Sequence, residues 1–404
     1  MEKNKKFISL LAFLICVFSV NAQKFSFSPR IYSLKDDSLK EELFIYPLVG
    51  WNENDKWMPG IYLTNELFYK KKFRYQFLPL YSTKEKTIVG AGKISFNQDI
   101  NNSKNLSFFL QGKRFHLAPL SNHSLGYFQY EIGAKYTYTL QSDSVLKQHV
   151  IEAKYHKSET EGVNYKRVNG AVEAEKHVKH LDAIRTKWQF INHDKEQPFL
   201  TQVKIDAWTD FARMTANYEY DYNFKPKRWF TFRAFAGLFF YKSDEFVNKY
   251  DARISTNMYG WQNDIFYDGW FLGRNVNKAI YLMQGMSGEG SLYSISPLGK
   301  NWDWAISTSG SITFPIDIPL RVYASAGIAP NQLQNNKPFG MFEGGIVIMP
   351  SKKFFEIAFP LILDKSSKKV LSLNTKNYWQ RIRIIVNFDK INPHSWLKKP
   401  HLKK

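Results

Sequence analysis

The chain has 404 residues, of which 17% are aromatic and 44% hydrophobic, and its 56 basic and 36 acidic side chains give a net charge of +20. The aromatic content excludes a disordered chain, and the single cysteine excludes a disulfide framework and a thiolate zinc module. A basic excess of this size is typical of proteins that bind nucleic acid or an anionic membrane.

Residues 1–22 have the pattern of a secretory signal peptide, which decides between these two partners. A charged n-region precedes the apolar run 7–20, which is too short to span a membrane, and Ala22 is a small residue suited to cleavage. Cleavage after Ala22 removes Cys16, the only cysteine, and leaves 53 basic and 35 acidic side chains, a net charge of +18. Because an exported protein does not meet nucleic acid, we expect no nucleic-acid partner.

The sequence beyond the signal peptide alternates between apolar and polar residues with a period of two. From Phe128 to Leu140, one parity is apolar and largely aromatic, and the other is polar or small. Side chains alternate across a strand, so such a segment has one apolar and one polar face. A soluble sandwich alternates as well, but these segments are long, carry charges on the polar face and have aromatic residues near their ends. We therefore expect an all-β fold, namely a transmembrane antiparallel up-and-down β-barrel of a Gram-negative outer membrane.

The alternation predicts about sixteen strands, within a range of about 12 to 18. In such barrels the periplasmic turns are short and the outer loops are long. The lengths of the connections therefore place 42–388 in the barrel, with an N-terminal periplasmic segment, 23–41, before it and a basic periplasmic tail, 389–404, after it. The expected strands are 42–50, 57–68, 72–82, 86–97, 104–116, 125–140, 147–157, 181–192, 198–209, 213–224, 228–241, 303–314, 319–328, 339–349, 353–363 and 378–388, and the long outer loops are 158–180, 242–302, 329–338 and 364–377.

Common catalytic motifs are absent from the sequence. It contains no His-Glu-x-x-His pair, no Gly-x-Ser-x-Gly elbow and no P-loop, so we expect neither an enzyme nor a cofactor. The strongest candidate for a metal site is the group Glu173, His177 and His180, which would share one face of a helix. A solvated charged loop explains the same residues without a metal.

Histidines near strand ends leave one catalytic alternative open. Some barrel enzymes place a Ser/His or Asp/His pair at the rim, and His116, His123, His149 and His156 lie near the ends of expected strands. Nine histidines spread over many strands also produce such neighbours by chance.

The stretch 242–302 is long for a loop and too aromatic to be disordered. Its side chains either form a surface that binds a sugar or a peptide, or fold into the barrel mouth as a plug. The residues of the possible ligand site are Tyr259, Trp261, Asp264, Asp268, Trp270 and Arg274.

Basic residues are expected in three places. Those on the polar faces of strands point into the lumen and favour anions there. Those in the outer loop 364–377 lie near phosphates of outer-membrane lipid and surface glycolipid, and those in the tail 389–404 either bind a periplasmic partner or act as solubilising charge. The lumen group is Lys72, Arg74, Lys187, Arg233, Arg321, Arg381 and Arg383, and the outer-loop group is Lys365, Lys368, Lys369 and Lys376.

Several short segments resemble a barrel region of certain Gram-negative proteins. They are 47–55, 77–81, 88–92, 232–237 and 342–346, with 354–361 and 381–393 as a closing pair. That region follows the catalytic domain of large gluzincin-type proteins, which are similar to zinc aminopeptidases, so the resemblance implies an outer-membrane barrel. The zinc-binding helix of that family lies upstream of its barrel, and no zinc ligand in this sequence matches it, so no peptidase residue carries over.

Together these observations favour a pore or channel for small polar or anionic solutes. The first alternative is a membrane anchor for a separately encoded periplasmic or surface protein such as a peptidase. The second alternative is an outer-membrane enzyme with its site at the rim.

Overall fold

The computed structural model describes most of the chain from Glu42 onward and a short piece before it. The described residues are 28–31, 42–66, 71–120, 123–142, 145–168, 171–226, 228–249, 254, 256, 266, 268–270, 272–273, 284–285, 290–294, 301–315, 318–331, 337–351, 355–374 and 377–386. No helix within these ranges is long and apolar enough to cross a membrane. The expected signal peptide and the basic tail lie outside them and stay predictions.

The described residues form one 18-stranded sheet. Its first strands are β1 (Ser28–Ile31), β2 (Glu42–Asn52), β3 (Lys56–Thr64), β4 (Phe73–Ser82), β5 (Thr87–Asn101), β6 (Lys104–Leu120), β7 (His123–Ser142), β8 (Val145–Val168) and β9 (Ala171–Asn192). The others are β10 (Phe199–Ala207), β11 (Phe211–Lys225), β12 (Arg228–Lys242), β13 (Gln284–Gly285), β14 (Trp304–Thr313), β15 (Leu320–Asn331), β16 (Lys337–Ser351), β17 (Phe355–Leu363) and β18 (Arg383–Val386). The helical elements are α2 (Asp244–Lys249), α4 (Lys365–Asn374) and the 3₁₀ helix η3 (Tyr378–Arg381).

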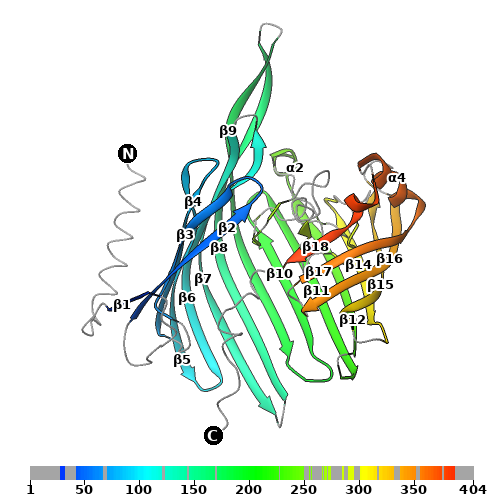
Figure 1. Ribbon diagram of the computed structural model, residues 1–404, viewed down its shortest axis with the longest axis horizontal. Helices are drawn as coiled ribbons and strands as arrows, with labels where there is room; N and C mark the ends of the chain where they lie inside the picture. The colour runs from blue at the N-terminus through cyan, green and yellow to red at the C-terminus, as the bar shows by residue number, and fades with distance from the viewer. Residues whose placement is uncertain are drawn as a thin grey trace.

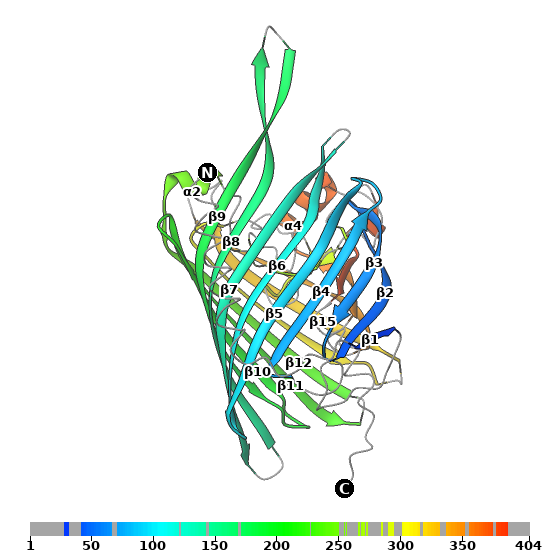
Figure 2. The same ribbon diagram turned by 90° about the vertical axis from the view of Figure 1, so that its left-hand side faces the viewer.

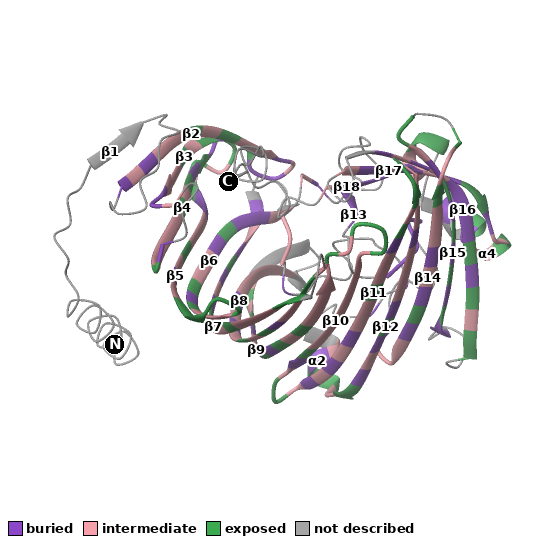
Figure 3. Ribbon diagram, turned by 90° about the horizontal axis from the view of Figure 1, so that it is seen from below, coloured by how far each residue is buried: buried purple, intermediate pink, exposed green. Residues whose placement is uncertain are grey.

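The strands pair in chain order, each antiparallel to the next, from β2 to β12 and then from β12 through β14 to β18. Two short strands differ, because β1 pairs parallel with β2 and β13 pairs parallel with β18. Each of the sixteen expected strands has a counterpart, so the predicted all-β, antiparallel up-and-down fold is confirmed. Viewed along its axis, the sheet curls from β2 through β9 to β18 around a central space, which we call the lumen (Figure 3).

The two faces of the sheet differ in polarity as the alternation predicts. On β7, Phe128 and Ile132 point outward and are 43% and 48% exposed. Their neighbours Gln129 and Glu131 point into the lumen and are 3% and 0% exposed. The sheet therefore has an exposed apolar outer face and a polar interior, the reverse of the usual arrangement in a soluble domain.

The long connections lie together at one end of the sheet, which we call the outer end. The β8–β9 hairpin, α2 and α4 are all at this end, whereas short turns join the strands at the other (Figures 1 and 2). Residues 158–180 were expected to be a loop, and this is wrong: β8 and β9 continue through them as a two-stranded ribbon that projects beyond the sheet (Figure 1). The hydrogen bonds between two paired strands do not require an apolar face, so a hairpin can extend beyond the sheet without the alternating pattern.

Two further expectations near the C-terminus need correction. Residues 365–374 form the helix α4 inside the expected outer loop, and Lys365, Lys368 and Lys369 are exposed on it. Their contact with glycolipid phosphates stays a prediction, and Lys376 lies outside the described residues. The last strand begins at Arg383, so Arg381 lies in the helix η3 and was wrongly placed on a lumen-facing strand.

Candidate functional site

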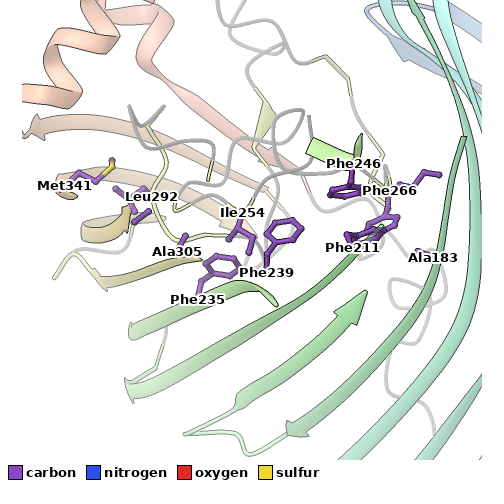
Figure 4. Close-up of a cluster of buried hydrophobic side chains, with 12 residues drawn as sticks. Ala183, Phe211, Phe235, Phe239, Phe246, Ile254, Phe266, Leu292, Ala305 and Met341 are labelled. Atoms are coloured by element: carbon purple, nitrogen blue, oxygen red, sulfur yellow. The ribbon is translucent and has the colours of Figure 1, made fainter. Parts of the chain in front are cut away.

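Between β12 and β14, the described residues of the range 243–303 pack against the lumen side of the sheet, and we call these residues the inner segment. Its residues Phe246, Ile254, Phe266 and Leu292 are at most 2% exposed and pack against inward side chains of the sheet wall (Figure 4). The ring of Phe246 stacks on that of Phe211 from β11 at 4.3 Å. Burial of these side chains stabilises the segment against the wall near the outer end.

Carboxylates of the wall also bind the backbone of the inner segment. Glu343 on β16 accepts hydrogen bonds from the N–H groups of Tyr293 and Ser294 at 2.5 and 2.9 Å. Glu356 on β17 accepts one from the Tyr293 hydroxyl at 2.8 Å. Within the segment itself, the Gln284 amide, in β13, donates to the backbone oxygen of Trp270 and accepts from the N–H of Leu272. Because charged acceptors strengthen such bonds, the contacts with Glu343 and Glu356 fix the position of the segment on the wall.

A buried ion-pair network joins the inner segment to the opposite wall. Arg185 on β9 donates to both carboxylate oxygens of Asp268 in the inner segment, at 2.6 and 2.8 Å. The same guanidinium donates to Asp206 on β10 at 2.8 Å, and Arg213 on β11 donates to Asp206 at 3.0 Å. Its face also lies over the ring of Phe266, with the guanidinium carbon 3.8 Å from the ring centre. The side chains of Arg185, Arg213 and Asp206 are at most 7% exposed, so solvent screens the contacts with Asp206 very little, whereas the Asp268 side chain is 34% exposed.

The network continues to β7 and β8 through Glu131. The Nδ1 atom of His156 lies 2.8 Å from this carboxylate, and Lys154 lies 2.9 Å from it. Glu131 and His156 are both 0% exposed. The network contains three cations and three carboxylates, so its net charge is zero if His156 is neutral. The cations are Lys154, Arg185 and Arg213, and the carboxylates are Glu131, Asp206 and Asp268.

A cavity of about 760 Å³ lies in the lumen beside this network. Asp268, Trp270, Gly290 and Ser291 of the inner segment line it on one side. The rest of its wall comes from the sheet, whose lining residues include seven basic, four acidic and six Asn or Gln. The cavity is therefore a polar chamber with an excess of positive charge, bounded by the inner segment.

The predicted lumen-facing basic residues occupy different surroundings. Lys187 lies 3.3 Å from Glu152, Arg233 lies 2.8 Å from Glu356, and both line the cavity. Arg74 lies 3.3 Å from Glu66, and Arg321 donates to Thr231 at 2.8 Å. Arg383 donates to the backbone oxygens of Gln380 and Ile382. Lys72 is exposed just before β4. The structure thus brings only Lys187 and Arg233 of this group to the cavity.

The predicted ligand site in residues 259–274 is described only in part. Asp268 bonds to Arg185, and the Trp270 ring packs edge-on against Phe115 of β6 at 5.0 Å. Both side chains therefore hold the inner segment to the wall as well as lining the cavity. The other four members, Tyr259, Trp261, Asp264 and Arg274, lie outside the described residues.

The metal candidate Glu173, His177 and His180 rested on a helix, and this expectation is wrong. All three residues lie on the strand β9. His177 and His180 are three positions apart, so they point to opposite faces of the strand. His180 lies 3.5 Å from Glu159. No cluster of three metal-ligating side chains is found within the described ranges.

One polar cluster at the outer end joins three turns of the sheet. Asp55, in the β2–β3 turn, is 0% exposed and lies 2.5 Å from Nδ1 of His116 on β6. Asn52 donates to the same carboxylate, and Ser82 donates to the Asp55 backbone oxygen. Burial would raise the pKa of the Asp55 carboxyl, but the hydrogen bonds from His116 and Asn52 outweigh it and hold that pKa below its usual range. We interpret the Asp55–His116 contact as a structural interaction that holds the turns of the sheet together.

We expect Asp55→Asn to lower the free energy of unfolding by about 1–3 kcal/mol at neutral pH, because it weakens a buried, charge-assisted contact. A folded pKa below the unfolded value stabilises the protein above the unfolded pKa, and the effect is lost as the pH falls through the folded pKa. The difference between wild type and variant should therefore shrink in acid, as measured by urea unfolding at neutral and acidic pH. Asp99→Asn, on an exposed strand end, is the control; an equal loss there would contradict the role of Asp55.

Comparison with known proteins yields similarities of structure only. No protein-family model and no curated protein sequence matches the chain. Among solved structures, it is similar to BamA from Haemophilus ducreyi lacking POTRA domains 1–3, with a TM-score of 0.47 and 9% identity over 81% of this chain and 70% of that one. It is also similar to CdiB from Acinetobacter baumannii, with a TM-score of 0.37 and 9% identity over 80% of this chain and 59% of that one. At this identity nothing about the activity of either protein transfers.

Proposed function

We propose that this chain is an outer-membrane β-barrel protein that forms a pore for small polar or anionic solutes, narrowed by its inner segment. The membrane location is supported by the outward faces of the strands, where large apolar side chains are exposed in strand after strand. The pore is supported by the polar cavity, which the inner segment bounds inside the lumen. The observation that carries the proposal is the excess of basic over acidic side chains around this cavity.

The inner segment sets the width of the proposed pore. It is fastened to β9 by Arg185, to β16 by Glu343 and to β17 by Glu356. Fastening on several sides of the lumen makes a constriction that is held in place, and its release would widen the path. The two other functions drawn from the sequence, an anchor for a partner and a rim enzyme, stay predictions.

We expect purified, folded protein to give discrete conductance steps in planar bilayers, with chloride more permeable than potassium. The reason is that the basic excess of the cavity attracts anions and repels cations. The measurement is the sign of the reversal potential in a potassium chloride gradient. Protein unfolded before addition serves as the control, and a folded preparation that gives no steps, or that prefers potassium, would overturn the proposal.

A further inference from the structure

The inward side chains at one level of the sheet form a row that is rich in lysine. The registers place Lys135 of β7 opposite Glu152 of β8, Glu152 opposite Lys187 of β9, and Lys187 opposite Lys204 of β10. The row therefore holds three lysines and one glutamate on four consecutive strands. Lys187 and Lys204 are direct neighbours across the strands with no acid between them.

The carboxylates of the cavity are already engaged by other cations. Glu131 lies 2.9 Å from Lys154, and Asp206 accepts from Arg185 and Arg213. The remaining three are likewise close to cations, since Glu152 lies 3.3 Å from Lys187, Glu219 lies 3.7 Å from Arg233, and Asp268 lies 2.6 Å from Arg185. Across the strands from Lys204 stand Lys187 and Thr215, so neither neighbour is an acid.

Like charges directly opposite each other on a sheet destabilise it. Lys187 and Lys204 line the same cavity, and Lys93 lines it from β5, with its ammonium 4.9 Å from the centre of the Phe109 ring. An anion held between these ammonium groups would relieve their repulsion. Because several lysines share one nearby glutamate, a solute with more than one negative charge fits the site better than chloride does.

We propose that Lys93, Lys187 and Lys204, with Lys135 next in the row, form a binding site for a small oxyanion solute carrying two or more negative charges, such as a phosphate-bearing or dicarboxylate solute. The proposal deepens the proposed pore by naming its solute class, and it rests on that pore for access to the lumen. The amide side chains around the cavity, among them Gln189 and Gln202, would donate further hydrogen bonds to the same solute.

The test is equilibrium binding to the full folded chain in detergent micelles, measured by calorimetry with inorganic phosphate, succinate and chloride at equal ionic strength. We expect phosphate or succinate to bind more tightly than chloride, and the tighter of the two identifies the class of oxyanion. Lys204→Gln should weaken that binding by about tenfold, the effect of one lost charge-assisted contact. Lys225→Gln, an exposed position at the end of β11, is the matched control and should bind like the wild type.

Thermal unfolding without added oxyanion separates binding from folding. Lys204→Gln removes the repulsion from Lys187 together with an attraction to Asp206 and Asp268, so its melting temperature should stay close to that of the wild type. Binding of phosphate and succinate no tighter than that of chloride, or unchanged binding by Lys204→Gln, would overturn the site. Binding that Lys204→Gln weakens, in a protein that gives no conductance steps, would support the site and reject the pore.

Discussion

Replacing Arg185 with Met is expected to lower the free energy of unfolding by about 3–5 kcal/mol, because removal of one partner from a buried ion pair leaves charges without compensation. Arg185 bonds to Asp206 and Asp268 and packs over Phe266, so one substitution affects two strands and the inner segment. The measurement is urea unfolding of protein folded into lipid vesicles, for wild type and variant in parallel.

The same substitution should change the proposed pore. Without Arg185, the hydrogen bonds between Asp268 and the wall of β9 are lost, whereas the contacts of Tyr293 with Glu343 and Glu356 remain. We therefore expect the inner segment to loosen on the β9 side and the mean conductance to rise. Bilayer recordings of both proteins under one set of conditions provide the measurement.

Two variants serve as controls for Arg185→Met. Arg185→Lys keeps the charge but cannot make the two parallel bonds to Asp268. Its free energy of unfolding should therefore lie between those of the wild type and Arg185→Met. Arg74→Gln removes a lumen arginine whose side chain is 35% exposed beside Glu66, and it should cost no more than about 1 kcal/mol. If Arg185→Met were as mild as Arg74→Gln and left the conductance unchanged, Arg185 would not hold the inner segment.

The fold could be predicted well because one physical rule governs each strand. A period of two separates an apolar from a polar face, and this rule located the strands that the structure shows. It failed where no apolar face is required. The ribbon formed by 161–168 and 171–183 extends past the sheet, and its mixed charges are equally typical of a loop. The helices α4 and η3 are too short for a helical period to show clearly.

The alternation of apolar and polar residues could not predict the contacts of the charged network in the lumen. Parity places Glu131 and Lys187 on an inward face, but it does not say which inward residues meet. Which residues are neighbours depends on the register between adjacent strands. That register places four residues side by side on β8 to β11, namely Lys154, Arg185, Asp206 and Arg213. Charges at inward positions of successive strands were a usable signal for this part of the site.

The inner segment carried no such signal. Asp268 lies 83 positions from Arg185 in the sequence, and no local pattern links the two. Its aromatic content indicated either a plug or a ligand surface, and sequence alone could not decide where those side chains lie. Packing against Phe211, Phe235 and Phe239 is a tertiary effect of the space inside the curled sheet.

A charged side chain on the outward face of the sheet should lower the free energy of unfolding more than the same side chain on the lumen face. Ile132 lies midway along β7, points outward between Leu110 and Tyr155 of the neighbouring strands and is 48% exposed. If the outward face contacts lipid, Ile132→Arg should lower the free energy of unfolding in vesicles by about 2–4 kcal/mol, the cost of an arginine near the bilayer midplane.

The matched control is Thr137→Arg, which places the same side chain on the lumen face of the same strand. It should change the free energy of unfolding by no more than about 0.5 kcal/mol, because the lumen face is polar and solvated. The two variants place the same side chain on opposite faces of one strand, so a much larger loss for Ile132→Arg than for Thr137→Arg indicates contact of the outward face with lipid. Equal costs in vesicles would mean that the outward face of β7 does not contact lipid, and the proposed outer-membrane location would have to be given up.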